Sequence, residues 1–117
     1  MARKLKIDYD LESDLLWLHD GRRVKDSLQM DSFVVDFAGN GEVSGIEIFN
    51  ASQLLNRLSP VSMGKDALKN IKSAILKTHR EKELLYMIFL IKIVVKKETM
   101  SIPIQLNTPR AVMMVRN

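Results

Sequence analysis

A chain of 117 residues has the length of one ordinary domain, and we expect residues 1–117 to fold around a single hydrophobic core. Its composition, 46% hydrophobic and 27% charged, is typical of a globular protein and excludes a disordered or collagenous chain. The sequence contains no cysteine, which excludes disulfides, thiolate zinc sites and thiol nucleophiles and favours a cytoplasmic location.

We expect no signal peptide and no membrane span. Residues 1–9 include basic side chains but no apolar stretch behind them. The most apolar run, residues 84–91, is far shorter than the roughly 20 residues that a spanning helix needs.

The net charge of +4 is unevenly distributed along the chain. Residues 1–64 carry seven Lys or Arg against ten Asp or Glu, a net of −3, whereas residues 65–117 carry eleven against four, a net of +7. An acidic half joined to a basic half favours self-association or the binding of a polyanion.

Residues 1–50 are predicted to form an antiparallel β-meander. Alternation of apolar and polar residues, or short apolar runs, predict strands at residues 5–9, 15–18, 32–37 and 43–49. Turn sequences separate these strands, above all Asp20-Gly21 and Gly39-Asn40-Gly41, because these residue types tolerate positive φ.

Residues 51–80 are predicted to be helical. Two short helical turns at residues 51–58 end before Pro60, and a longer helix is expected from a cap at Ser62 to about His79. The spacing of apolar residues gives that helix a core-facing side, formed by Ala67, Leu68, Ile71, Ala74 and Ile75.

Residues 81–117 are predicted to form a C-terminal β-hairpin and a tail. Strands are expected at residues 84–96 and 100–106, with a short strand at 111–115. Pro103 cannot donate to a ladder, so its strand should lie at a sheet edge or a bulge. The expected class is therefore α+β, an antiparallel meander and a hairpin with the sheet packed on a central amphipathic helix.

Acidic residues recur at every second position from residue 8 to residue 14. Such spacing superficially resembles a calcium loop, but the glycine and the closing bidentate Glu of such a loop are absent. We therefore expect a turn held by bonds from Asp side chains to the backbone, with no metal and no cofactor. Neither histidine, His19 or His79, has a recognisable nucleophile or metal beside it in the sequence, so we expect no enzyme.

Three lysines, Lys65, Lys69 and Lys72, fall on the side of the predicted helix opposite its apolar face. They could contact phosphates of a nucleic acid. No aromatic residues interleave with them, so a solvated face is the preferred interpretation.

Residues 84–91 are apolar on both faces of their predicted strand, which a sheet with one wet face does not explain. One row of side chains should pack in the core, and the other row must be covered by something else. We favour a second copy of the chain over other parts of the same monomer as what covers it. The row proposed for self-association is Leu84, Tyr86, Ile88 and Leu90.

Three segments resemble a known family: residues 9–18 (YDLESDLLWL), 35–37 (VDF) and 41–52 (GEVSGIEIFNAS). They are similar to the opening and closing motifs of the prokaryotic and archaeal domain of unknown function family 2283, with Trp17 and Ser44 in place of the common Tyr and Val. The resemblance covers about residues 5–55 and implies the meander, with Tyr9, Asp10, Glu12 and Asp14 as a motif turn. Some members are similar to proposed antitoxins, which implies protein–protein binding.

The sequence thus favours a self-associating, non-catalytic protein–protein interaction module with a small protein partner, and an antitoxin-like role is its more specific form. A nucleic-acid-binding accessory protein is the alternative, and a metal-dependent enzyme is the remote one.

Overall fold

The structure is a computed structural model that describes residues 2–109. These residues form one antiparallel sheet, one α-helix and one short 3-10 helix. In chain order the elements are β1 (Ala2–Asp10), β2 (Leu15–His19), β3 (Asp26–Met30), β4 (Phe33–Phe37), β5 (Val43–Ile48), α1 (Ala51–Leu58), η1 (Lys65–Asn70), β6 (Ile71–Glu81), β7 (Leu84–Val95) and β8 (Glu98–Pro109).

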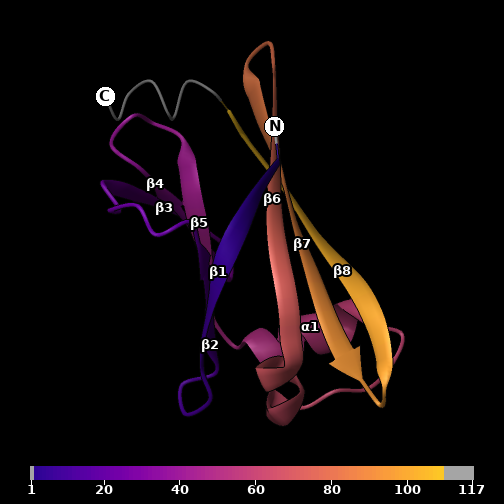
Figure 1. Ribbon diagram of the computed structural model, residues 1–117. Helices are drawn as coiled ribbons and strands as arrows, with labels where there is room; N and C mark the ends of the chain where they lie inside the picture. The colour runs from indigo at the N-terminus through magenta and orange to yellow at the C-terminus, as the bar shows by residue number, and fades with distance from the viewer. Residues whose placement is uncertain (1, 110–117) are drawn as a thin grey trace.

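The strands are ordered β3-β4-β5-β2-β1-β6-β7-β8, and β1 joins two halves of the sheet. Its first residues, 2–5, pair with β6, whereas residues 6–10 pair with β2. The two parts of β1 therefore pair on opposite sides of the strand, one with β6 and the other with β2. The two halves of the sheet diverge from β1, and the sheet curls into a half-barrel (Figure 1).

The core lies on the concave face of this sheet. Inward side chains of both halves form one hydrophobic cluster, which α1 and η1 close at one end (Figure 1). Its fully buried large members include Leu16, Leu18, Ile46, Ile48, Leu55, Leu68, Leu76, Leu85, Met87, Phe89, Ile91 and Ile93.

The predicted helix from Ser62 to His79 is wrong. Only residues 65–70 are helical, and residues 71–81 form the long strand β6. Within β6 Ala74 and Leu76 are buried while Lys77 is exposed, as strand alternation requires. Apolar residues in this segment also fit a helical period, and the backbone partners offered by β1 and β7 override that local preference.

The C-terminal hairpin and the antiparallel pairing of the N-terminal strands are confirmed. The N-terminal strands do not form the predicted meander, because β2 pairs with β5 and not with the strands that follow it directly in the chain. The prediction missed β3, whose residues 26–30 lack a strong apolar pattern. Pro103 lies in β8, which is an edge strand as predicted. The molecule is mostly β with one short α-helix, so α+β describes it only loosely, and the predicted strand at 111–115 lies outside the described residues.

None of the helices in the described part of the chain is long and apolar enough to cross a membrane.

Candidate functional site

The two faces of β7 differ in burial. On the concave side Leu85 and Phe89 are at most 1% exposed, and their neighbours Met87 and Ile91 are completely buried. On the convex side Leu84, Tyr86, Ile88 and Leu90 remain partly exposed, and Tyr86 is 37% exposed. The structure therefore decides which row packs in the core, and we call the convex one the outer apolar row.

Neighbouring strands extend the outer apolar row and frame it. Leu90 pairs with Ile75 on β6 and with Pro103 on β8, which gives an apolar band across three strands. Lys4 pairs with Ile75 and Lys77 pairs with Ile88, so these lysines share the convex face on its β1 and β6 side.

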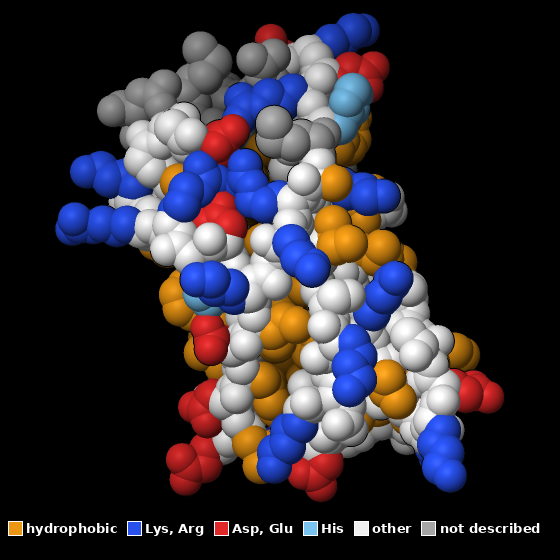
Figure 2. Space-filling model, viewed as in Figure 1, with side chains coloured by type: hydrophobic (Ala, Val, Ile, Leu, Met, Phe, Trp, Pro, Cys, Tyr) orange, Lys and Arg blue, Asp and Glu red, His pale blue; other side chains and the backbone are white. Residues whose placement is uncertain are grey.

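On the β8 side the partners are uncharged, Gln105 opposite Ile88 and Asn107 opposite Tyr86. Figure 2 shows this face, with Lys and Arg side chains spread over it and hydrophobic side chains between them.

The three lysines assigned to polyanion contact do not lie on one helix. Lys65 and Lys69 belong to η1 and Lys72 to the start of β6, and all three are exposed. The pattern that grouped them assumed a helical period that this segment does not have.

The acidic motif residues fall in the turn between β1 and β2. Asp10 accepts hydrogen bonds from the Glu12 backbone N–H at 3.1 Å and from the Ser13 hydroxyl at 2.7 Å. The Ser13 hydrogen bond is the main reason why the pKa of Asp10 lies below its usual range. Glu12 is exposed, with its side chain in solvent.

Asp14 has a different role, because its side chain points away from solvent and is 5% exposed. Its carboxylate accepts hydrogen bonds from the Tyr9 hydroxyl at 2.6 Å, the Ser52 hydroxyl at 2.6 Å and the Ser52 backbone N–H at 3.0 Å. Burial alone would raise the pKa of Asp14, but these bonds lower it below its usual range. Asp14 thereby ties the opening motif to the first turn of α1, where a negative charge is favourable.

Within residues 2–109 no group of three or more His, Cys, Asp or Glu side chains is arranged to hold a metal ion.

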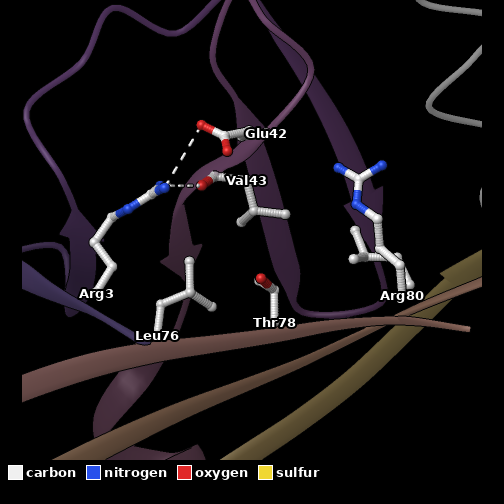
Figure 3. A pocket seen from close by; sticks show the side chains of 7 residues that line it. Arg3, Glu42, Val43, Leu76, Thr78 and Arg80 are labelled. Carbon is white, nitrogen blue, oxygen red and sulfur yellow. Dashed lines mark hydrogen bonds and ion pairs between the residues drawn. The ribbon is translucent and has the colours of Figure 1, made fainter. Parts of the chain in front are cut away.

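A pocket of about 60 Å³ opens between the two halves of the sheet, near the start of β1 and the end of β6. Figure 3 shows Arg3 and Arg80 on opposite sides of it, with Leu76 and Thr78 along its floor. Its lining residues are Arg3, Glu42, Val43, Leu76, Thr78, Arg80 and Leu85.

An ion-pair network holds one wall of this pocket. Arg3 donates to Asp20 at 2.9 Å and to the Val43 carbonyl at 3.1 Å. Arg22 bridges the two carboxylates, with 2.7 Å to Asp20 and 2.7 Å to Glu42. Burial would raise the pKa of Asp20, but Arg22 and Arg3 hold it below its usual range, and the hydrogen bond from Arg22 likewise lowers the pKa of Glu42.

A second polar cluster lies on the convex face of the other half of the sheet. Asp36 is completely buried and accepts hydrogen bonds from Trp17 Nε1 at 3.1 Å and from the Ser27 hydroxyl at 2.9 Å. Glu47 is hydrogen-bonded to Asp36. Burial, with the hydrogen bond and charge of Asp36, raises the pKa of Glu47 to about 7.

His19 lies beside this cluster. Its ring stacks on Trp17 with centroids 3.8 Å apart, and its Nε2 is 2.6 Å from Asp8 Oδ2. Trp17 thus connects the Asp8–His19 pair to the Asp36–Glu47 pair on one surface.

Sequence reasoning missed both the pocket and the Asp36–Glu47 pair. The pocket forms only because β1 pairs with β6. The residues of β6 were predicted to be helical, so this pairing was not expected. In the sequence Asp36 and Glu47 are visible only as two separate motif residues. The register of β4 and β5 brings them together, because Val34 lies opposite Glu47 and Asp36 lies opposite Gly45.

Comparisons with known proteins support the resemblance for the N-terminal part of the chain. Residues 6–52 match the family described as "Protein of unknown function (DUF2283)". This segment includes the Asp14 turn, the Asp36–Glu47 pair and the start of α1.

Two relatives each match part of the chain. An "Uncharacterized protein MJ0789" of Methanocaldococcus jannaschii is 52% identical over 54 residues, which are 45% of this chain and 47% of that protein. A protein of Methanosarcina mazei named "Putative hypoxanthine phosphoribosyltransferase" is 29% identical over 68 residues, 57% of this chain and 50% of that protein. The chain thus matches about half the length of these relatives, and no solved structure matches it significantly.

Proposed function

We propose that this chain is a cytoplasmic, non-catalytic protein-binding module that self-associates through the convex face of β6, β7 and β8. One observation carries the proposal: the outer apolar row stays partly exposed although the alternate row of the same strand is completely buried. Large apolar side chains left in water forgo roughly 1.5–3 kcal/mol of burial each. A partner that covers this row would recover much of that free energy.

The occupant that best fits this face is a second copy of the chain. Under a two-fold axis parallel to β7, the outer apolar rows of the two copies meet. The same rotation turns the β6 side, with Lys4 and Lys77, over the uncharged β8 side of the other copy, with Gln105 and Asn107. This arrangement buries apolar surface and keeps Lys4 and Lys77 away from the same lysines of the other copy, whereas Lys92, which follows Leu90 on the convex face, faces Lys92 of the other copy at the end of the row.

Pairing through the β8 edge is less favourable. Pro103 lies in the middle of this edge strand, and it has no N–H to offer to another strand. Face-to-face packing of sheets avoids this missing donor.

Sedimentation equilibrium at micromolar concentration tests the proposal. We expect a mass twice the 13.4 kDa of one chain, and we expect Ile88→Gln to shift the protein to monomer. Leu58→Gln is the matched control, because Leu58 is 46% exposed on α1, away from the convex face.

A monomeric wild-type protein at tens of micromolar would overturn the proposal. A dimer that survives Ile88→Gln would place the interface elsewhere.

Nucleic-acid binding is the second candidate, favoured by the net charge of +7 on residues 65–117. Phosphate contacts make affinity fall steeply with salt, whereas an apolar interface is nearly insensitive to it. Binding of duplex DNA or single-stranded RNA tighter than micromolar at physiological salt would promote this candidate if changing Lys65, Lys69 and Lys72 to Gln abolishes it.

A small protein partner, as an antitoxin-like role would imply, is a finer form of the protein-binding proposal. It rests on the family resemblance and on the acidic charge of residues 1–64. A neighbouring gene that encodes a small basic protein, and co-purification of the two products, would support it. The M. mazei relative carries an enzyme name, but this chain matches only half of that protein. The name is therefore not carried over to this chain.

A further inference from the structure

The convex face of β1, β2 and β5 carries a second group of uncovered apolar side chains, with acids beside them. Asp8 lies opposite Trp17, which in turn lies opposite Glu47, and one row further along Asp10 lies opposite Leu15. Residues opposite one another on adjacent strands point to the same side of a sheet. That side is the convex one, because the alternate residues of β2 are completely buried in the core.

Phe49 extends this group beyond the end of β5. It follows Ile48, which is buried on the concave side and pairs with Leu16, so Phe49 lies beside Leu15 on the convex side. The Phe49 backbone N–H donates to the Ser32 carbonyl at 3.3 Å, and its side chain is 41% exposed. We call the whole group the acidic–aromatic face, formed by Asp8, Asp10, Leu15, Trp17, Glu47 and Phe49.

Trp17 is a rigid anchor on this face. Its Nε1 donates to Asp36 at 3.1 Å, and its ring stacks on His19 with centroids 3.8 Å apart. These two contacts fix the indole while the side chain stays partly exposed. An aromatic side chain that is already ordered loses little conformational entropy on binding, and tryptophan is among the residues that contribute most to protein interfaces.

The acids of this face carry charge that no cation offsets. The side chain of Asp8 is 65% exposed and lies 2.6 Å from His19 Nε2. The Gly21 backbone N–H donates to Nδ1 of the same ring at 3.2 Å, so Nδ1 carries no proton and the imidazole is neutral. Within residues 2–109 no lysine or arginine lies within ion-pair distance of Asp8, Asp10 or Glu47.

The charge of this face selects the kind of partner. Acidic side chains follow the β1–β2 side of the molecule in Figure 2, and Lys6, opposite His19, lies at the far end of the face. A surface of this sign repels nucleic-acid phosphates and anionic lipids, and it attracts cationic protein surfaces. The apolar side chains between the acids need a partner that is also apolar on the side it presents.

We propose that the acidic–aromatic face docks a basic, amphipathic segment of another protein. The inference rests on the protein-binding role proposed above and names the surface and the chemistry of the partner. Apolar side chains of that segment cover Leu15, Trp17 and Phe49, and its Lys or Arg side chains pair with Asp8 and Asp10. The proposed dimer buries the convex face of β6, β7 and β8, so it leaves this face free on each copy.

Fluorescence titration of the full chain with short tryptophan-free peptides tests the proposal, because Trp17 is the single tryptophan. The probe is a synthetic peptide in which Lys alternates with Leu, and we expect it to change the Trp17 emission saturably. Phe49→Ser should weaken binding about tenfold or more, as the loss of an interface anchor does. Asp8→Asn should weaken it about two- to fivefold, as the loss of an exposed ion pair does.

Two variants outside the face are the matched controls. Leu58→Gln removes an apolar side chain that is 46% exposed on α1, and Glu98→Gln removes an exposed charge at the start of β8. The affinity of both should stay within about twofold of wild type. A peptide with Glu in place of Lys should not bind, and one with Gly in place of Leu should bind more weakly than the probe.

The proposal is overturned if the Lys–Leu peptide does not bind, if the Glu–Leu peptide binds equally well, or if Phe49→Ser and Asp8→Asn bind like wild type. A mass beyond the dimer in sedimentation, reduced by Phe49→Ser, would also overturn it and identify a second copy as the occupant. Ile88→Gln should bind the peptide like wild type whether or not the protein dimerises. Failure of self-association is therefore distinguished from failure of this inference.

Discussion

Glu47 is hydrogen-bonded to Asp36, and its pKa is raised although both side chains lie on ordinary strands. Burial and the neighbouring Asp36 carboxylate raise the pKa of Glu47 to about 7, from an ordinary 4.5. The groups that face it are Asp36 on β4 and Trp17 and His19 on β2, with Ser27 of β3 bonded to Asp36. A proton on Glu47 is what allows two acids to share a hydrogen bond.

This raised pKa predicts a pH-dependent stability. The folded state holds the Glu47 proton more tightly than the unfolded state, so the stabilisation is fully present below about pH 4.5 and is lost as the pH rises through about 7. Glu47→Gln keeps a neutral donor for Asp36 and removes the titration. We expect the variant to gain about 1–3 kcal/mol of unfolding free energy relative to wild type between pH 5 and pH 8.

Urea unfolding at several pH values measures this difference. Glu12→Gln is the control, because Glu12 is an exposed acid in the β1–β2 turn. The raised pKa would be contradicted if the difference in unfolding free energy between Glu47→Gln and wild type did not change from pH 5 to pH 8.

At the scale of the elements, Gly45 lets β5 approach β2 closely. A Cβ at this position would lie 2.4 Å from the Leu18 carbonyl oxygen and 2.9 Å from His19 Cα, both backbone atoms that cannot move aside. The closing family motif therefore needs glycine here for strand packing.

Gly45→Ala should separate these two strands. We expect a loss of about 1–3 kcal/mol of unfolding free energy, as for other overpacked sites. Gly39→Ala is the matched control, since nothing lies within 4 Å of a Cβ there, and its change should stay within about 0.5 kcal/mol. Equal denaturation midpoints for the two variants would show that β2 and β5 tolerate the added methyl group.

At the scale of the whole molecule, both halves of the curled sheet contribute to one core. The single tryptophan, Trp17, reports on the β2 half, whereas Ile91 is buried in the β7 half. We expect Ile91→Val to cost about 0.5–1.5 kcal/mol and to lower the urea midpoint equally by Trp17 fluorescence and by circular dichroism. A fluorescence midpoint that stays at the wild-type value would mean that the halves unfold separately.

The sequence by itself determined the elements whose signal is local. Turn residues such as Gly39-Asn40-Gly41, alternation in residues 5–9 and the apolar run at 84–91 specify strands and hairpins through neighbouring residues alone. The motifs of residues 9–18 and 41–52 carried the family resemblance for the same reason.

Only the tertiary structure decided the state of residues 71–81, because their apolar spacing suits a helix and a strand. As a strand, this segment forms backbone hydrogen bonds with β1 and β7 and buries its inward side chains. A solvated helix in the same place would form its own backbone hydrogen bonds but would bury less of its apolar surface. The same pairing brings Arg3 and Arg80, far apart in the sequence, to one pocket. It also decides which row of β7 is buried, since strand alternation gives two rows but not the side on which the core lies.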